Sequence, residues 1–530
     1  MKSKAEFFNA TFPAGPAAVN EFGVEKWLDN IFIPVPQKTY YDISDKIEMA
    51  YGKSIKCLDP SKEAYWSWVT CYKLKYQLTE YLYRRLFFRK IKEEGFDRIY
   101  TKSKLPLADA ENALPGILIL PKVFPEKNMS HIMKERLRVF RANWKNLHVL
   151  NYLFPSIFNS KLYITGGKEN DETMAYLQDL GVDPIALRPD LYIRESNNPT
   201  DKFFSESEPA CEVFRKEMTE VLETYNLRLP DGYFEDFAKH IANCASVISG
   251  TRDRIRNFPH SELIINPVGN LKHRIFASAW RLSGGTTTGL VHGNTFSYGY
   301  IPIDMINGAT LIFNRFVVMS TEEKNFFESS SRKYDKGLGY SSEIYSCKNS
   351  IYKKYFKELQ VGEPPEKIVK VMVIGTPINE NLPLSWMMNY MYLELLLVST
   401  LLKNGYHVIF KTHPGTSIDI GTFFDSGKCE RATGRFEDEW PLCDCIIFPQ
   451  TGTTTFGYSL MTTKHTIAFK WPDCSAWRPE LLNSLNKRIS LIDVGFNTDG
   501  RPVFDKGALL ESLSNPKAFD YSVVHEFALK

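Results

Sequence analysis

The residues best suited to chemistry follow two short apolar runs in the C-terminal third of the chain. A histidine comes directly after HVIFKT, and a cluster of threonines follows DCIIFPQ. An imidazole can contact a phosphate, and hydroxyls together with the free amides at a helix start can hold one. We therefore predict a nucleotide site. Its predicted residues are Lys411, His413, Pro414, Gly415, Thr451, Gly452, Thr453, Thr454 and Thr455.

Each motif also has a purely structural interpretation. His413 can cap a turn in which Pro414 ends the strand, without touching any ligand. One threonine can serve as the N-cap of the following helix while the others only pack. Gly452 favours the ligand interpretation, because a residue without a side chain lets the backbone approach a bound group.

The elements that must position these residues lie within 370–470. The β-rich runs KVMVI, HVIFK, CIIF and TIAFK alternate with helical patterns, which is typical of parallel strands in a βαβ sheet. Ligands of such sheets bind outside the carboxyl ends of the strands. The histidine and the threonines both follow such ends.

The chain as a whole is expected to be α/β with at least two domains, because 530 residues exceed a single core. We predict an N-terminal α/β domain with helical insertions (1–360), a C-terminal Rossmann-like domain (366–500) and a tail (501–530) that packs back on the first domain. The linker is expected within 326–365, which ends in two prolines. In the first domain, strands are predicted at 116–120 and at the runs ending at Gly167, Gly250, Phe296 and Ser320.

Composition excludes several classes of protein. Hydrophobic residues make up 43% and charged residues 24%, which argues against disorder and against a membrane-spanning protein. The first residues contain no long apolar core, and the nine cysteines form no disulfide framework, so we expect a reducing cytoplasm. A net charge of +3 does not indicate nucleic-acid binding.

The segment 72–104 is basic, with ten Lys or Arg against four Asp or Glu. Leu74, Leu78, Leu82 and Leu86 recur every four residues within it, which predicts an amphipathic helix. One interpretation is a helix buried on its apolar face with a solvated basic face. The other is a peripheral contact with the inner face of the cytoplasmic membrane, or with a polyanionic acceptor.

The motifs resemble those of a known enzyme family. HVIFKTHPG followed by FPQTGTTTFGYSLM is similar to the histidine-proline and serine/threonine-rich motifs of bacterial GT-B glycosyltransferases that use CMP-sugars, including β-Kdo transferases of capsule and O-antigen synthesis and sialyltransferases. GLVHGNTF followed by LIFNRFVVMSTEEKNFF is similar to a passage of capsule-synthesis proteins, with Val291 where those often have Gln. The resemblance covers roughly residues 245 to 470.

The resemblance implies two Rossmann-like domains facing one another across a cleft, and transfer of a sugar acid, with Kdo the first choice. The partners would be a nucleotide-sugar donor and a glycan or lipid-linked glycan acceptor. His413 would contact the nucleotide phosphate and support the departing CMP. No cofactor and no essential metal are expected, since such enzymes usually stabilise the leaving phosphate with protein cations and dipoles.

Glycosyl transfer also needs a general base or a carboxylate nucleophile from the facing domain. Asp253 is the first candidate, because it follows the strand predicted to end at Gly250; His292 is the second, and Glu235 ranks third beside Asp231. Arg252, Arg254 and Arg256 would bind the carboxylate of the donor sugar. The competing interpretation of Asp253 is a structural Arg–Asp cluster at a helix start.

Three other functions remain open at this stage. One is a polyol-phosphate transferase of the teichoic acid type that uses CDP-glycerol or CDP-ribitol, since those proteins carry similar motifs. Another is a GT-B enzyme that uses a UDP- or GDP-sugar, or an epimerase of that fold. The last is a non-catalytic assembly partner.

Overall fold

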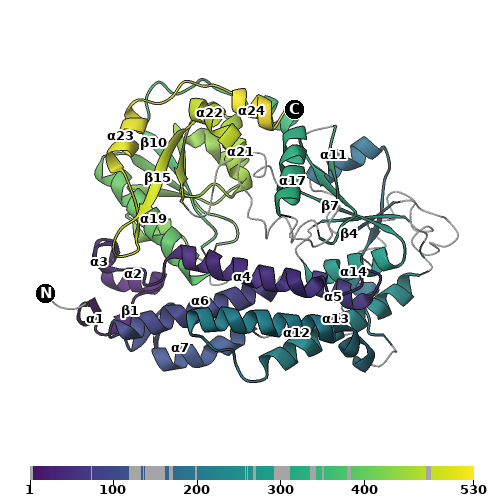
Figure 1. Ribbon diagram of the computed structural model, residues 1–530. Helices are drawn as coiled ribbons and strands as arrows, with labels where there is room; N and C mark the ends of the chain where they lie inside the picture. The colour runs from purple at the N-terminus through teal and green to yellow at the C-terminus, as the bar shows by residue number, and fades with distance from the viewer. Residues whose placement is uncertain are drawn as a thin grey trace.

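The structure is a computed structural model that describes residues 4–72, 74–118, 133–134, 137, 162–165, 171–196, 200–256, 258, 261–266, 270–291, 311–334, 342–348, 351–378, 383–416, 418–472 and 479–530. Figure 1 shows two α/β units next to one another above a shared layer of helices. The fold class is α/β, as predicted. Parallel sheets form the centre of both units.

The C-terminal unit is built on a sheet with the strand order β12-β11-β10-β13-β14-β15-β16 in the described residues, parallel except for β16. Its strands are β10 (Lys370–Ile374), β11 (His407–Lys411), β12 (Cys429–Ala432), β13 (Cys445–Phe448), β14 (His465–Lys470), β15 (Ser490–Phe496) and β16 (Pro502–Phe504). Its helices are α19 (Leu384–Lys403), η3 (Ile420–Phe423), α20 (Phe436–Glu439), η4 (Trp440–Leu442), α21 (Thr454–Met461), α22 (Pro479–Arg488), α23 (Lys506–Ser514) and α24 (Ser522–Phe527). The four predicted strands are confirmed.

The central strands of this sheet are apolar because helices cover both faces. All residues of β13 are buried, as are the last four of β10 and of β11. Lys370 pairs with His407 and Ile374 pairs with Lys411, so β10 and β11 end at the same edge. The segments that follow them therefore start side by side.

The N-terminal unit contains a second parallel sheet, which has the order β5-β4-β6-β7-β8-β9 in the described residues. Its strands are β4 (Leu162–Thr165), β5 (Ile185–Leu187), β6 (Glu262–Ile265), β7 (Thr286–Leu290), β8 (Arg315–Val318) and β9 (Glu343–Ser346). The helices between these strands include α11 (Asp171–Leu180), η2 (Pro189–Leu191), α14 (Leu271–Leu282) and α17 (Thr321–Tyr334), and α18 (Ile351–Leu359) follows the last strand.

A layer of helices lies beneath both units (Figure 1). It is formed by α4 (Gln37–Ile55), α5 (Glu63–Cys71), α6 (Leu74–Glu93), α12 (Thr200–Tyr225) and α13 (Tyr233–Ile255). The smaller elements near the amino terminus are α1 (Lys4–Phe7), β1 (Thr11–Phe12), α2 (Pro16–Phe22), α3 (Val24–Asn30), β2 (Arg98–Tyr100), β3 (Lys104–Pro106), α7 (Leu107–Ala113) and η1 (Leu114–Leu118).

The helical layer is bonded to both units. On one side, the buried Arg274 of α14 donates hydrogen bonds to the carbonyls of Val69 (2.7 Å) and Thr70 (3.2 Å) at the end of α5. On the other, Asn389 of α19 donates to Gln37 of α4 at 3.1 Å. Hydrogen bonds thus connect the helical layer to both units.

The amphipathic helix predicted at 72–104 is confirmed as α6, whose four repeating leucines are buried. Its cations are largely engaged within the protein. Lys75 is fully buried and pairs with Glu48 at 3.1 Å. Arg84 pairs with Glu80, and Arg89 donates to backbone carbonyls at the end of α12. These contacts favour the interpretation of α6 as a packed helix.

The strand predicted to end at Gly250 is wrong, because that run lies inside α13. Small residues there let the helix approach the chain around 194–196 closely. A Cβ on Gly250 would stand 2.3 Å from the backbone of Glu195, and Ser196 donates its N–H to the Ser246 carbonyl at 3.1 Å. Helical periodicity with small residues at a tight contact was mistaken for a strand.

Two further predictions need correction. Residues 114–118 form the 3-10 turn η1, so the strand predicted at 116–120 is wrong where the chain is described; the rest lies outside the described residues. The expected linker 326–365 contains β9, α18 and part of α17. In the described residues, only 360–369 connects the two units without a helix or strand.

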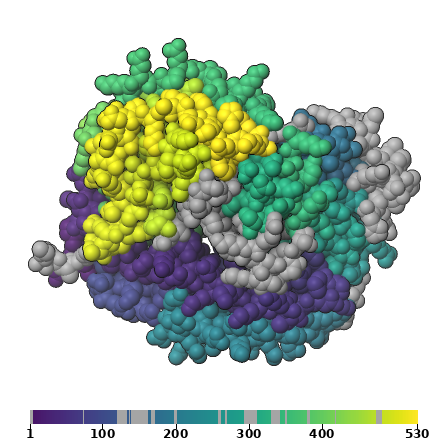
Figure 2. All heavy atoms as spheres, turned by 45° about the horizontal axis from the view of Figure 1, so that its top comes forward, coloured from purple at the N-terminus to yellow at the C-terminus, as the bar shows by residue number. Residues whose placement is uncertain are grey.

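The last residues of the chain lie against the N-terminal unit, whereas β16 and α23 of the predicted tail 501–530 belong to the C-terminal unit. Ser320, just before α17, donates its hydroxyl to the Phe527 carbonyl at 3.0 Å, and Thr321 donates to the Lys530 carbonyl at 2.8 Å. Figure 2 shows the yellow tail meeting the green segment that contains α17. None of the helices in the described part of the chain combines the length and apolar composition needed to cross a membrane.

Candidate functional site

The order of the strands singles out one place in the C-terminal sheet. The chain leaves β10 for β11 on one side and returns to β13 on the other side of β10. This is a topological switch point, outside which open α/β sheets bind their ligands at the carboxyl ends. The segments that meet there are 375–378 after β10, 449–453 after β13 and, one strand away, the turn that holds His413.

The turn after β11 fixes the protonation state of His413. Gly415 donates its N–H to Nδ1 of His413 at 3.0 Å, so Nδ1 is unprotonated and a neutral ring carries its proton on Nε2. Partial burial, and then the charge of Lys411, lower the pKa of His413. Near neutral pH the imidazole therefore offers one N–H from Nε2, which has no partner among the described residues.

Lys411 differs from its predicted role. Its side chain is buried, and Nζ lies 3.5 Å from Glu439 and donates to the Thr412 carbonyl at 3.2 Å. Glu439 also accepts the Gly434 N–H at 2.7 Å. Lys411 thus connects α20 to the end of β11, and its charge contributes to the lowered pKa of His413.

The segment after β13 is held by Gln450. The Gln450 side-chain oxygen accepts the Gly452 N–H at 2.7 Å, where a Cβ on Gly452 would stand 2.9 Å from that oxygen. Thr451 is buried, whereas Gly452 is exposed. The backbone at Gly452 is exposed, and its N–H is already bonded to Gln450.

Thr453 is the N-cap residue of α21, but its hydroxyl does not cap the helix. Its Oγ1 is buried and has no hydrogen-bond partner in the described residues, and the same holds for Oγ1 of Thr412 after β11. The first amides of α21, from Thr454 and Thr455, have no intrahelical acceptors. Two unsatisfied hydroxyls and a helix amino end therefore point to the binding of an anion at this edge.

The two motifs are close enough to act on one ligand. β11 and β13 flank β10, so their ends are roughly 10 Å apart at the usual spacing of strands. A nucleotide with its phosphate and sugar spans such a distance. His413 and the amino end of α21 thus face the same edge of the sheet, on either side of β10.

α21 also meets the N-terminal unit. The Tyr458 ring of α21 lies 4.8 Å from the Tyr355 ring of α18, centroid to centroid, and the Tyr355 hydroxyl donates to Asp171 at the start of α11. Burial is the main cause that raises the pKa of both phenols; the Asp171 contact adds to it for Tyr355, and the charges of Glu172 and Glu437 add to it for Tyr458. The two hydroxyls therefore stay protonated at neutral pH.

The candidate catalytic residues from sequence are not brought to this edge. Asp253 lies in the last turn of α13, exposed, and the chain runs from there into β6, which begins at Glu262. It is therefore near the amino end of the N-terminal sheet, whereas ligands bind at carboxyl ends. Glu235 lies on the first turn of α13 and pairs with Arg215 at 3.0 Å on the exposed surface. His292 lies outside the described residues.

The predicted arginine cluster does not form around Asp253. Arg252 pairs with Glu63 of α5 at 2.8 Å, while Arg254 and Arg256 are exposed. Asp253 makes no ion pair with another described residue. Arg252 thus connects α13 to α5, and the predicted binding of a sugar carboxylate by the three arginines stays a prediction.

Sequence reasoning missed Asp171, Tyr355 and Glu394. Asp171 follows β4, the strand at the switch point of the N-terminal sheet, where the chain moves to β5 on one side and β6 on the other. The short strand LYIT was recognised, so the next acidic residues were a signal that could have been used. Glu394 lies inside an apolar helix pattern, where a single acid attracts no notice.

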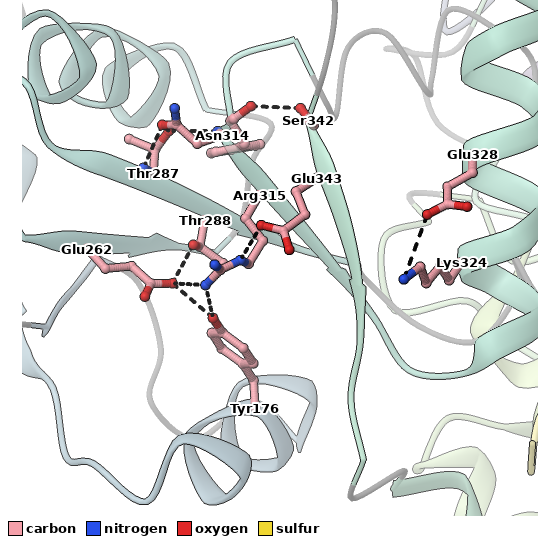
Figure 3. A network of polar contacts seen from close by, with 11 residues as sticks. Tyr176, Glu262, Thr287, Thr288, Asn314, Arg315, Lys324, Glu328, Ser342 and Glu343 are labelled. Atoms are coloured by element: carbon pink, nitrogen blue, oxygen red, sulfur yellow. Dashed lines mark hydrogen bonds and ion pairs between the residues drawn. The ribbon is translucent and has the colours of Figure 1, made fainter.

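The N-terminal sheet carries a polar network that is easily mistaken for a site (Figure 3). Glu262 accepts from Thr288 at 2.5 Å and from Tyr176 at 2.9 Å, and Arg315 pairs with Glu262 (3.6 Å) and Glu343 (3.3 Å). Three of these residues begin their strands, so the network closes the amino edge of the sheet. Its geometry fits a structural role.

Among the described residues, no group of three or more His, Cys, Asp or Glu side chains is arranged to hold a metal ion. Comparison of the chain with protein-family models, with curated proteins and with solved structures found no match.

Proposed function

We propose that this chain is a glycosyltransferase of GT-B organisation that transfers a sugar acid, with Kdo the first choice, from a CMP-activated donor to a growing bacterial surface glycan. The observation that supports this most strongly is the switch point of the C-terminal sheet. There the turn of His413 and the amino end of α21 follow the two strands that flank β10, and this shared edge is the proposed position of the donor phosphate.

The chemistry follows from the charge that develops when the glycosidic bond to CMP breaks. Negative charge grows on the leaving phosphate, and fixed dipoles aimed at it stabilise the transition state without reorganising. His413 supplies a neutral N–H, and α21 supplies its positive dipole end. Because His413 is neutral near pH 7, it acts first as a hydrogen-bond donor to the phosphate.

The carboxylate of the reaction is assigned to Asp171 in place of Asp253. Asp171 is exposed, comes after β4 in the chain and accepts a hydrogen bond from the Tyr355 hydroxyl next to Tyr458 of α21. A carboxylate at that junction can act as the base that activates an acceptor hydroxyl or as a nucleophile. His292 stays a candidate from sequence alone.

The acceptor would be a glycan or a lipid-linked glycan at the inner face of the cytoplasmic membrane. Membrane contact through 72–104 stays a prediction, and the internal pairing of α6 leaves few of its charges for lipid. Binding of the chain to anionic vesicles, measured by sedimentation, would test it.

A thermal-shift panel of CMP, CDP, UDP and GDP tests the donor, because a nucleotide that binds only the folded state raises the melting temperature. We expect CMP to give the largest shift and His413→Ala to remove most of it. A larger shift with UDP or GDP would favour another GT-B donor. In a separate hydrolysis assay, release of glycerol phosphate from CDP-glycerol would favour the polyol-phosphate alternative. No shift with any of the four would refute the nucleotide site.

A further inference from the structure

Glu394 is an acid buried in the middle of α19, under the switch point. Its side chain is fully buried. Oε1 accepts the backbone N–H of Thr376 at 2.7 Å and the Thr376 hydroxyl at 2.6 Å. Oε2 is buried and has no hydrogen-bond partner among the described residues. An acid with half of its acceptors unused is unusual in a protein interior.

Hydrogen bonds connect this acid with the turn that holds His413. Ile378 donates its N–H to the Thr376 carbonyl at 2.7 Å, and Thr416 donates its hydroxyl to the Ile378 carbonyl at 2.7 Å. Thr416 also donates its N–H to the His413 carbonyl at 3.0 Å. A continuous path thus runs from the interior of α19, through the segment after β10, to the turn after β11.

Backbone contacts and tight packing also restrict the position of the segment after β10. Gly375 donates its N–H to the Lys411 carbonyl at 2.9 Å, and a Cβ at Gly375 would stand 2.8 Å from the ring of Phe410. Thr376 is itself buried. The backbone beside the switch point therefore takes its position from the buried side of the sheet.

We propose that Glu394 is a positioning residue that holds Thr376 and the His413 turn in the geometry that binds the donor's phosphate. This proposal rests on the proposed function of the same edge. Glu394 touches no ligand. Its effect passes through the hydrogen bonds of Thr376.

The neutral form is the ordinary one at neutral pH. Burial raises the pKa of Glu394 to about 8, and the two bonds from Thr376 only partly offset it. On the elements packed against α19, which are α3, α4, β11, β16 and η3, no charged side chain among the described residues contributes to this shift. Above pH 8 the acid becomes a buried anion with one unpaired oxygen, which is strongly unfavourable in that place.

The consequence is a loss of affinity in alkaline solution. If only the neutral form holds the site in its binding geometry, the apparent Kd for CMP rises as the neutral fraction falls, by about tenfold between pH 7 and pH 9. His413 is already neutral in this range, since its pKa is lowered. A phosphate monoester with its second pKa near about 6 is fully ionised in this range. Neither group adds to the trend.

The experiment is titration calorimetry with CMP at pH 7, 8 and 9 on the full chain, with Glu394→Gln and the exposed Glu363→Gln as a matched control. Glutamine keeps the oxygen that Thr376 bonds and cannot ionise. We expect the wild type and Glu363→Gln to weaken about tenfold across the range, and Glu394→Gln to bind like wild type at pH 7 with no pH dependence. An equal pH slope in wild type and Glu394→Gln would overturn the proposal.

A second measurement without ligand separates this proposal from the proposed function. A carboxyl whose folded pKa is raised binds its proton more tightly in the native state, so the native state loses stability as pH rises from the unfolded value near 4.5 to about 8. Over that window the melting temperature of wild type should fall relative to that of Glu394→Gln. Above it, the difference between the two melting temperatures should stay constant. If wild type binds no CMP at pH 7, the proposed function is refuted. The pH dependence of the melting temperature still measures the ionisation of Glu394 in that case.

If Glu394→Gln does not fold, Thr376→Val provides the same test. It removes the 2.6 Å hydroxyl bond and keeps the backbone bond. Losing one of the two bonds weakens the hold on Thr376, so we expect weaker CMP binding already at pH 7. Losing one bond to the ionised form also raises the pKa of Glu394 further, so we expect the fall in CMP affinity to move to higher pH. An unmoved pH profile in Thr376→Val would overturn the proposal.

Discussion

Arg488 stabilises the carboxyl end of α21, the helix whose amino end forms the proposed phosphate site. Its guanidinium is buried at the carboxyl end of α21 and donates to the carbonyls of Leu460 (3.0 Å), Ser459 (3.3 Å), Thr462 (2.8 Å) and Lys464 (3.0 Å). A cation at that end also interacts favourably with the helix dipole. We predict that Arg488→Met destabilises the C-terminal unit by about 4 kcal/mol. The carbonyls of Leu460 and Lys464 lose their Arg488 donor at about 1–3 kcal/mol each, whereas Ser459 and Thr462 keep other donors and lose less.

Urea unfolding of the full chain, followed by tryptophan fluorescence, measures this loss as a shift in the transition midpoint. Arg488→Lys keeps the charge and loses the planar fork, so about half of the effect is expected. Arg254→Met, on an exposed arginine, should change stability by less than about 0.5 kcal/mol. A loss below about 1 kcal/mol in Arg488→Met would refute the reasoning that α21 depends on Arg488.

Three further predictions concern the edge and its carboxylate. Gly375→Ala should abolish or strongly weaken CMP binding, because its Cβ would overlap buried neighbours. Gly415→Ala should retain binding, because a Cβ at Gly415 would meet the histidine ring at an ordinary 3.4 Å. Calorimetry with CMP compares the two variants. Asp171→Asn should keep the CMP thermal shift and lose transfer by several orders of magnitude in a donor-turnover assay, while Asp253→Asn should retain activity; the reverse pattern would restore the original assignment. Tyr355→Phe should lower turnover and leave the Kd for CMP unchanged, and unchanged turnover would limit the hydroxyl to a structural role.

The parallel strands of the C-terminal sheet could be predicted because their signal is local. Runs such as HVIFK and CIIF are buried on both faces and end in residues that cannot continue a strand, so composition and length sufficed. The same locality placed His413 and Thr453 at strand ends. Which strands are neighbours depends on long-range pairing, and the switch point became visible only with the sheet order.

Around residue 250 the local signal misled. Val247 and Ile248 favour a strand, yet both are buried in α13, where contacts with α5 and α12 decide the conformation. The catalytic assignment of Asp253 depended on a strand ending at Gly250, and α13 occupies that position instead. Glu394 and Asp171 depend on partners far away in sequence, Thr376 and Tyr355, and no spacing rule could have paired them.

The central claim is that a CMP phosphate binds between the His413 turn and the amino end of α21. A crystal structure of the chain with CMP tests it most directly. We expect phosphate oxygens about 3 Å from Nε2 of His413 and from the amides of Thr454 and Thr455, at ordinary hydrogen-bond distance. CMP bound at any other place, such as the carboxyl edge of the N-terminal sheet, would contradict it.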